Sequence, residues 1–239
     1  LDTTVAASPD ATLDDKGRLD GDLYLIGGGD PTLGDAGLTD LAARVRKAGV
    51  RRITGAIIGD ESLFDDRRGG PDSRYGYDYD LGGALGALVW SHGALREGNP
   101  ALAAATRFGA KLKAAGIRYA RAPRVGAVPR KPAGGGGASA AAPPNAPGRS
   151  PRMGNPVTAI NVPSENCYAG MLAKALGAQF GKAGSTRSGL AVASSALKPF
   201  SITPRLVDGS GLSRSNRTSS LTLVTLLAGM EASGVSDAY

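Results

Sequence analysis

The sequence predicts an α/β protein. Between residues 22 and 120, short runs typical of strands alternate with segments whose apolar residues recur at helical spacing. Hydrophobic residues make up 41% of the 239-residue chain, which is enough to form a buried core. Residues 131–149 are rich in Gly, Ala and Pro and cannot bury apolar side chains, so we expect a flexible linker there.

The segment before the linker predicts strands and helices in alternation. A strand over residues 22–26 ends in three glycines, and a helix follows over residues 38–48, with Thr39 as its N-cap and Gly49 as its stop. Further elements are then expected as a strand over 51–58, a helix over 100–115 and a short strand over 117–120. Pro100 suits the first turn of its helix, and Gly116 suits the end.

Helices dominate the prediction after the linker. Residues 165–180 are expected to form a helix whose apolar face carries Cys167, Met171, Leu172, Ala175 and Leu176. A strand or extended segment is predicted over 202–207, and an amphipathic helix over 220–232.

Positive charge is concentrated in the middle of the chain. The net charge of +7 divides into 11 cations and 17 anions over residues 1–97, 10 cations and no anion over 98–164, and 7 cations and 4 anions over 165–239. The basic residues lie beside Pro and Gly, with only Tyr119 available for base stacking, so we expect no nucleic-acid binding. A solvated basic linker is one reading, and attraction to an anionic polymer such as cell-wall material is another.

Several residues invite a chemical interpretation that their spacing does not support. The glycines at 27–29 fit neither a phosphate-binding loop nor a dinucleotide fingerprint, so we predict a structural turn. Asp60, Glu61, Asp65 and Asp66 lack the alternation of a calcium loop and are expected in a solvated loop. His92 is the only histidine and Cys167 the only cysteine. We therefore expect no disulfide, no zinc site, no other metal and no cofactor.

Two motifs are more informative in combination than alone. Ser164 and Asn166 flank Glu165 directly before a predicted helix, where a serine is most often an N-cap. A hydroxyl and an amide at this spacing can also relay a proton and hold an amide substrate. Residues 208–216 read Asp-Gly-Ser-Gly-Leu-Ser-Arg-Ser-Asn, which alone indicates a tight turn.

Four runs in this order resemble the D-Ala-D-Ala carboxypeptidase/endopeptidase family of penicillin-binding serine peptidases with a large insert. The family typically reads Gly-Asp-Leu-Tyr-Leu-x-Gly-x-Gly-Asp-Pro-Thr-Leu, as residues 21–33 do. Residues 55–64, 164–166 and 208–216 match its later runs. The resemblance implies a partial penicillin-recognising fold related to β-lactamases and transpeptidases. It assigns residues 1–130 mostly to an inserted α/β domain and residues 150–239 to part of the catalytic domain.

The resemblance also implies a function and a site. In the family, Ser-x-x-Lys supplies the nucleophile, Ser-x-Asn relays a proton and holds the substrate, and Lys-Thr-Gly lines the bound peptide. Ser164 and Asn166 are thus the expected catalytic residues, and Glu165 stands where Asp is usual. The expected reaction is D-Ala-D-Ala carboxypeptidase cleavage of peptidoglycan stem peptides through an acyl-enzyme, which β-lactams would trap.

The other two motifs of the family are not found in their expected places. Ser195 and Lys198 have the Ser-x-x-Lys spacing but follow Ser164, and no Lys-Thr-Gly occurs. We expect a truncated chain that is inactive alone. The parent protein is expected outside the cytoplasm, with its signal peptide outside this sequence, and no segment here has the roughly 20 apolar residues of a membrane span. The alternatives are a non-catalytic relative that binds peptidoglycan or a partner, and a basic polyanion-binding module.

Overall fold

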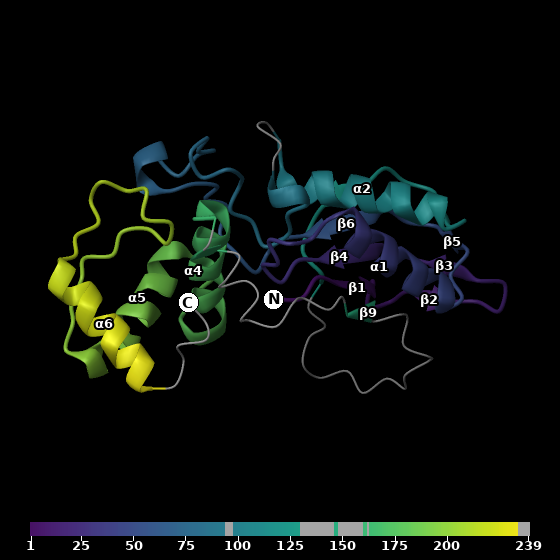
Figure 1. Cartoon of the computed structure of the whole chain (residues 1–239). Helices are drawn as coiled ribbons and strands as arrows, with labels where there is room; N and C mark the ends of the chain where they lie inside the picture. The colour runs from purple at the N-terminus through teal and green to yellow at the C-terminus, as the bar shows by residue number, and fades with distance from the viewer. Residues whose placement is uncertain (94–97, 130–145, 148–159, 162, 234–239) are drawn as a thin grey trace. The chain divides into compact units, whose positions relative to one another are not determined.

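The computed structural model describes residues 1–93, 98–129, 146–147, 160–161 and 163–233 (Figure 1). Its contacts divide the chain into two compact units. The N-terminal unit comprises residues 1–63 and 87–150, and the C-terminal unit comprises residues 64–86 and 151–239. Residues 64–86 thus pack with the second half of the chain. Of the predicted linker at 131–149, only residues 146 and 147 belong to the described part.

The N-terminal unit contains two mixed sheets. The larger has the order β8-β6-β4-β1-β9, in which β4 runs parallel to β6, β6 runs parallel to β8, and β1 is antiparallel to both β4 and β9. Its strands are β1 (Thr4–Ala7), β4 (Leu23–Ile26), β6 (Ile57–Asp60), β8 (Arg124–Val125) and β9 (Ala146–Pro147). The smaller sheet has the order β2-β3-β5-β7. Its strands are β2 (Thr12–Leu13), β3 (Arg18–Asp20), β5 (Arg52–Ile53) and β7 (Arg118–Tyr119).

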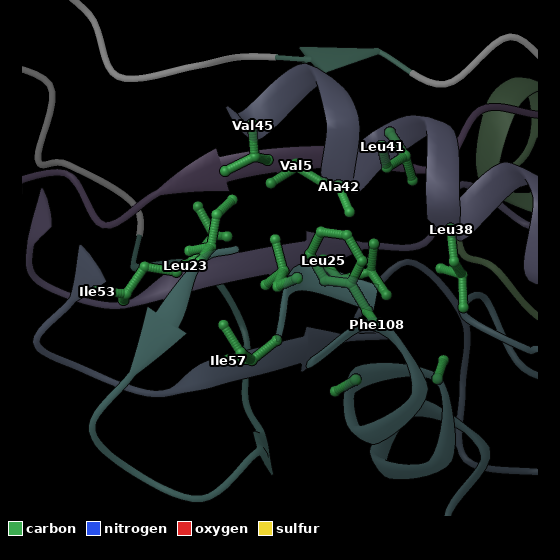
Figure 2. Close-up of a cluster of buried hydrophobic side chains, with 14 of the residues drawn as sticks. Val5, Leu23, Leu25, Leu38, Leu41, Ala42, Val45, Ile53, Ile57 and Phe108 are labelled. Atoms are coloured by element: carbon green, nitrogen blue, oxygen red, sulfur yellow. The ribbon is translucent and has the colours of Figure 1, made fainter. Parts of the chain in front are cut away.

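Two helices pack on these strands and close the core of the N-terminal unit. They are α1 (Asp35–Lys47) and α2 (Pro100–Ala114). Figure 2 shows Leu38, Leu41 and Val45 of α1 and Phe108 of α2 facing strand residues, all of them fully or almost fully buried. The strand side chains in this cluster include Val5, Leu23, Leu25, Ile53 and Ile57. Because alternate residues of a strand face opposite sides, Tyr24 of β4 lies in a second, smaller cluster with Ala56 and Ile58.

The predicted single strand over 51–58 is wrong, because the chain changes sheets in its middle. β5 belongs to the smaller sheet and β6 to the larger one. Gly55 lies between them and donates its N–H to the Gly21 carbonyl at 2.9 Å. A Cβ at Gly55 would lie 2.4 Å from that carbonyl oxygen, so the crossing requires glycine. Hydrophobicity alone cannot reveal such a change of partner.

The C-terminal unit is mainly helical over its described residues. It contains α4 (Asn166–Phe180), α5 (Thr186–Ala196) and α6 (Ser220–Ala232), with 3-10 turns at Pro71–Ser73 and Lys198–Phe200. A third such turn, Ser91–Gly93, belongs to the N-terminal unit. Within the described part of the chain, no helix is both long and apolar enough to cross a membrane.

Helix predictions are confirmed more often than strand and cap predictions. The helix at 220–232 is confirmed at both ends, and those at 100–115 and 165–180 within one residue. The expected N-cap at Thr39 is wrong: α1 begins four residues earlier after Gly34, and the Thr39 hydroxyl donates to the Asp35 carbonyl. The expected strand at 202–207 is reduced to one isolated bridge between Arg205 and Arg217.

Two further elements differ from expectation. Helix α5 was not predicted from the sequence, although Ser185 caps it by accepting from the Ser188 N–H at 3.2 Å. The helix at 220–232 is not amphipathic, since none of its residues is buried and Leu221, Leu223, Val224 and Leu227 are at least half exposed.

Candidate active site

Ser164 lies just before α4 and does not cap it. The N-cap position belongs to Glu165, whose side chain makes no capping hydrogen bond. Ser164 is exposed and has a φ of 60°, in the left-handed region that serine rarely adopts. Among the described residues, no hydrogen bond from the Ser164 hydroxyl is found. The N-cap interpretation of this serine is therefore wrong, and its hydroxyl is accessible for another role.

Asn166 begins α4 and is oriented by a segment far away in the sequence. Its Nδ2 donates to the Asp80 carbonyl oxygen at 3.2 Å, and the residue is half-buried. That bond ties the first turn of the helix to the loop at 64–86, within the same unit. This hydrogen bond restricts rotation of the Asn166 side chain, and the side-chain oxygen Oδ1 remains an acceptor.

Helix α4 is held by unusually close backbone contacts with α5. A Cβ at Gly189 of α5 would lie 1.6 Å from the Ala173 carbonyl oxygen, and one at Gly177 of α4 would lie 2.7 Å from the Gly189 backbone nitrogen. Both distances are far below van der Waals contact, so these two glycines set how closely the helices approach. The start of α4, with Ser164 and Asn166, is thereby attached to a rigid pair of helices.

A buried lysine fixes α4 to the chain that precedes residue 86. Lys174 is fully buried and donates from Nζ to the Asp65 carboxylate at 2.6 Å and to the Arg67 carbonyl oxygen. The burial of Lys174 was not predicted from the sequence, because lysine is normally solvated. A signal was present, since Lys174 follows Cys167 by seven residues and Met171 by three, which is the spacing of the buried face.

Cys167 is excluded as a nucleophile by its surroundings. Burial, with a smaller contribution from the Glu165 carboxylate, raises the pKa of the thiol to about 12. The reactive thiolate is therefore almost absent at neutral pH. Cys167 acts as a core residue of α4.

Residues 208–216 form a self-bonded loop that packs on α4. The Asp208 carboxylate accepts from the N–H groups of Gly211 at 2.8 Å and Ser213 at 2.7 Å and from the Asn216 amide at 2.8 Å. A Cβ at Gly209 would lie 2.8 Å from the Ala169 carbonyl oxygen. The two motifs identified in the sequence thus meet on one helix.

The same loop is also bonded to the segment at 64–86. The Ser213 hydroxyl donates to Asp72 at 3.1 Å, and the Arg214 N–H donates to the same carboxylate at 3.0 Å. Asp65, Asp72 and Asp80 therefore connect this segment to Lys174, to the loop at 208–216 and to Asn166. The carboxylates of Asp65 and Asp72 and the backbone carbonyl of Asp80 serve as structural ties within the C-terminal unit.

The other candidates have structural roles or lie at the surface. Among the glycines at 27–29, a Cβ at Gly27 would lie 2.2 Å from the Ala87 carbonyl oxygen, so this glycine is required by close backbone packing. Asp60 was expected in a solvated loop but is buried, and it accepts from the N–H groups of Ser62 and Val128 at 2.8 Å. His92 is exposed, in the other unit from Ser164.

Two further candidates are a metal site and the Ser-x-x-Lys spacing of Ser195 and Lys198. Across the described residues, no three His, Cys, Asp or Glu side chains are grouped to hold a metal ion. Ser195, on α5, and Lys198, in the turn after it, are both exposed. A cleft of about 330 Å³ in the C-terminal unit is lined by Arg67, Tyr75, Thr186, Arg187, Leu190, Ala191, Ser194, Leu206 and Val207, and neither Ser164 nor Asn166 contributes to it.

Comparison with known proteins identifies the family. A model of the D-Ala-D-Ala carboxypeptidase 3 (S13) family matches residues 2–82 and 76–239. A D-alanyl-D-alanine carboxypeptidase from Actinomadura sp. (strain R39) is 47% identical over 47 residues, which are 20% of this chain and 9% of that protein.

Solved structures show the same fold at low sequence identity. Penicillin binding protein 4 from Haemophilus influenzae superimposes with a TM-score of 0.78 at 17% identity, over 99% of this chain and 66% of that one. Its complex with a β-lactam gives a TM-score of 0.71 at 17% identity, over 98% of this chain and 64% of that one. The chain therefore spans about two thirds of these structures. It has part of the penicillin-recognising fold, and it belongs to the D-Ala-D-Ala carboxypeptidase 3 (S13) family.

Proposed function

We propose that the protein containing this chain is a serine-type D-Ala-D-Ala carboxypeptidase that cleaves peptidoglycan stem peptides. The observation that carries the proposal is Ser164. In a chain matched by the family model over nearly its whole length, this serine is exposed, does not cap α4, and precedes an anchored Asn166. A hydroxyl and an amide at the start of a rigid helix suit proton relay and amide binding.

In the proposed reaction, a serine outside this sequence attacks the carbonyl carbon of the penultimate D-Ala. The C–N bond to the terminal D-Ala breaks, and that amine leaves with a proton that the Ser164 hydroxyl relays. The Asn166 amide holds the peptide. Water then hydrolyses the acyl-enzyme ester, which releases the shortened peptide and restores the serine. A β-lactam acylates the same serine, and its ester hydrolyses slowly.

Partner and location follow from this substrate. We propose the D-Ala-D-Ala end of the peptidoglycan pentapeptide as the physiological ligand, and the outer side of the cytoplasmic membrane as the place of action. The 239-residue sequence holds no Ser-x-x-Lys before Ser164 and no Lys-Thr-Gly, so we expect this chain alone to be inactive.

Labelling with a fluorescent penicillin tests the proposal. The full-length protein should form a covalent adduct that survives denaturation, and the 239-residue chain alone should not. Ser164→Ala in the full-length protein should slow acylation by about 100-fold or more, since a positioned proton relay contributes at least that much. Absence of labelling in a folded full-length protein would favour a non-catalytic relative.

Ser195→Ala is the matched control. It removes an equally small hydroxyl from an exposed position in the same unit. Its acylation rate should equal that of the parent. If Ser195→Ala abolished labelling and Ser164→Ala did not, the nucleophile would lie in the Ser195–Lys198 pair and the role given to Ser164 would be wrong.

A further inference from the structure

Three arginines lie side by side across the smaller sheet of the N-terminal unit. Arg18 of β3 is the register partner of Arg52 in β5, and Arg52 is the partner of Arg118 in β7. Adjacent strands lie about 4.8 Å apart, so the three side chains start from one row at that spacing. We name this row, Arg18, Arg52 and Arg118, the arginine row.

The arginine row lies on the outer face of its sheet. On the same strands, Leu19 and Ile53 are completely buried in the core, and side chains of neighbouring strand residues point to opposite faces. All three arginines are exposed accordingly. Tyr119 follows Arg118, faces inward and packs against the core.

Few carboxylates compensate this charge. Arg18 lies 4.0 Å from Asp20, a distance at the limit of an ion pair, with both side chains more than half exposed. The Asp20 carboxylate also accepts from the Thr54 hydroxyl at 2.7 Å. Within the described ranges, no ion pair is found for Arg52 or Arg118. The centre of the row therefore carries uncompensated positive charge.

Stability of the sheet does not explain such a row. Like charges directly opposite one another on neighbouring strands are destabilising, whereas β-branched residues at these positions would be favourable. Charged residues are useful on edge strands, where they prevent unwanted pairing, but Arg52 is in β5, between β3 and β7. An arrangement that repels itself becomes favourable when an anion binds across it.

We propose that the arginine row binds a linear polymer of phosphodiesters that carries no bases, of the polyol-phosphate type. Each phosphodiester carries one negative charge shared by two free oxygens, which can accept from neighbouring guanidinium groups, and a linear chain of them places successive charges along the row. The ring of Tyr119, next to Arg118, packs against the core, so it is not available on the outer face for stacking with a nucleotide base. The arginine row should therefore recognise the charge of the polymer and not a base sequence. This proposal does not depend on the peptidase activity proposed above.

Salt dependence of binding tests the proposal on the full-length protein. The probe is sodium polyphosphate, a base-free chain of phosphates. Its affinity is measured by competition with fluorescently labelled polyphosphate, followed by fluorescence anisotropy. For three contacts with a single strand, the logarithm of the binding constant should fall with the logarithm of the salt concentration at a slope of about −2. The affinity should therefore fall about 20-fold from 50 to 200 mM salt. Arg52→Gln should reduce the slope to about −1.4, or about 7-fold over the same range.

Arg44→Gln is the control for net charge. Arg44 is partly exposed on α1 of the same unit and is paired with Asp40 at 2.8 Å, outside the row. Its variant should keep the parent slope. Arg52→Gln should also unfold at a temperature at least as high as the parent, because it relieves repulsion, and both variants should keep penicillin labelling unchanged.

Three outcomes would overturn the proposal. One is an equal slope for Arg52→Gln and Arg44→Gln. Another is a lower unfolding temperature for Arg52→Gln with unchanged affinity, which would make the row structural. The third is tighter binding of single-stranded DNA or polyglutamate than of polyphosphate at equal charge, which would exclude a base-free phosphodiester as the ligand.

Discussion

Removal of the Asp65 carboxylate should destabilise the C-terminal unit, because it leaves a buried ammonium without its counter-ion. Lys174 Nζ is completely buried and lies 2.6 Å from the Asp65 carboxylate, whose side chain is 30% exposed. The carbonyl oxygens of Asp65 and Arg67 also accept from Nζ. Asp65→Ala keeps these two neutral acceptors and removes a carboxylate charge that compensates the ammonium.

The expected loss is about 3 kcal/mol of unfolding free energy. Breaking a buried ion pair by deleting one partner costs about 3–5 kcal/mol, and the lower end applies here because two carbonyls remain and Asp65 is partly exposed. For a chain of this size, that loss lowers the unfolding temperature by roughly 6–12 °C. Lys174→Met keeps the length of the side chain and removes the charge, so it should cost about 1 kcal/mol.

Urea denaturation followed by circular dichroism measures each variant and the double variant. Because Asp65→Ala harms the protein only while the ammonium is present, the double variant should be about as stable as Lys174→Met alone. This implies a coupling of about 3 kcal/mol between the two positions. Asp66→Ala is the matched control, since Asp66 is the exposed neighbour, and it should stay within about 0.5 kcal/mol of the parent.

Two results would refute this reasoning. If Asp65→Ala were as stable as Asp66→Ala, the ammonium would not depend on that carboxylate. If Lys174→Met and Asp65→Ala each cost about 3 kcal/mol and their effects simply added, each side chain would contribute through packing, with no coupling of charges.

Three further predictions concern packing, pH and reactivity. Gly189→Ala should cost more than about 3 kcal/mol in denaturation experiments, because its Cβ would lie 1.6 Å from the Ala173 carbonyl oxygen, whereas Gly116→Ala, with a φ of 77° and open space, should cost about 1 kcal/mol. Hydrogen bonds from the Arg107 and Lys111 side chains hold the pKa of Asp35 well below its usual value, so its stabilising effect is present above the unfolded pKa and is lost as pH falls toward the folded one. Asp35→Asn should therefore destabilise at pH 7, and this difference should shrink in thermal melts as the pH falls below about 4; a constant difference would contradict it. Because burial raises the pKa of Cys167 to about 12, its thiol should resist a disulfide reagent at pH 8 in the folded protein and react at once in urea, and equal rates in both states would contradict the burial.

The contacts that stabilise the C-terminal unit also position the proposed catalytic residues. The ties from Asp65, Asp72 and Asp80 connect one loop to the middle of α4, to the loop at 208–216 and to the first residue of α4. A variant that loosens this loop should disturb the orientation of Asn166 as well as stability. We therefore expect Asp65→Ala to slow penicillin acylation of the full-length protein even where most of the protein is folded.

Several helices and the family could be predicted from the sequence alone. Helices at 100–115, 165–180 and 220–232 were predictable because apolar spacing and end signals act within a few residues. The order of the runs at 21–33, 55–64, 164–166 and 208–216 was sufficient to indicate the family, and the match to the family model confirms it. Catalytic roles for Ser164 and Asn166 remain predictions, and the penicillin-labelling experiments test them.

Tertiary structure decided which segments come together. No local signal shows that the chain changes sheets at Gly55, that Lys174 is buried against Asp65, or that Ser164 leaves the capping position to Glu165. Each of these depends on contacts between residues far apart in the sequence, whose free energy can exceed the local preferences by several kcal/mol. The same holds for the arginine row, since Arg18, Arg52 and Arg118 become neighbours only through the pairing of three strands.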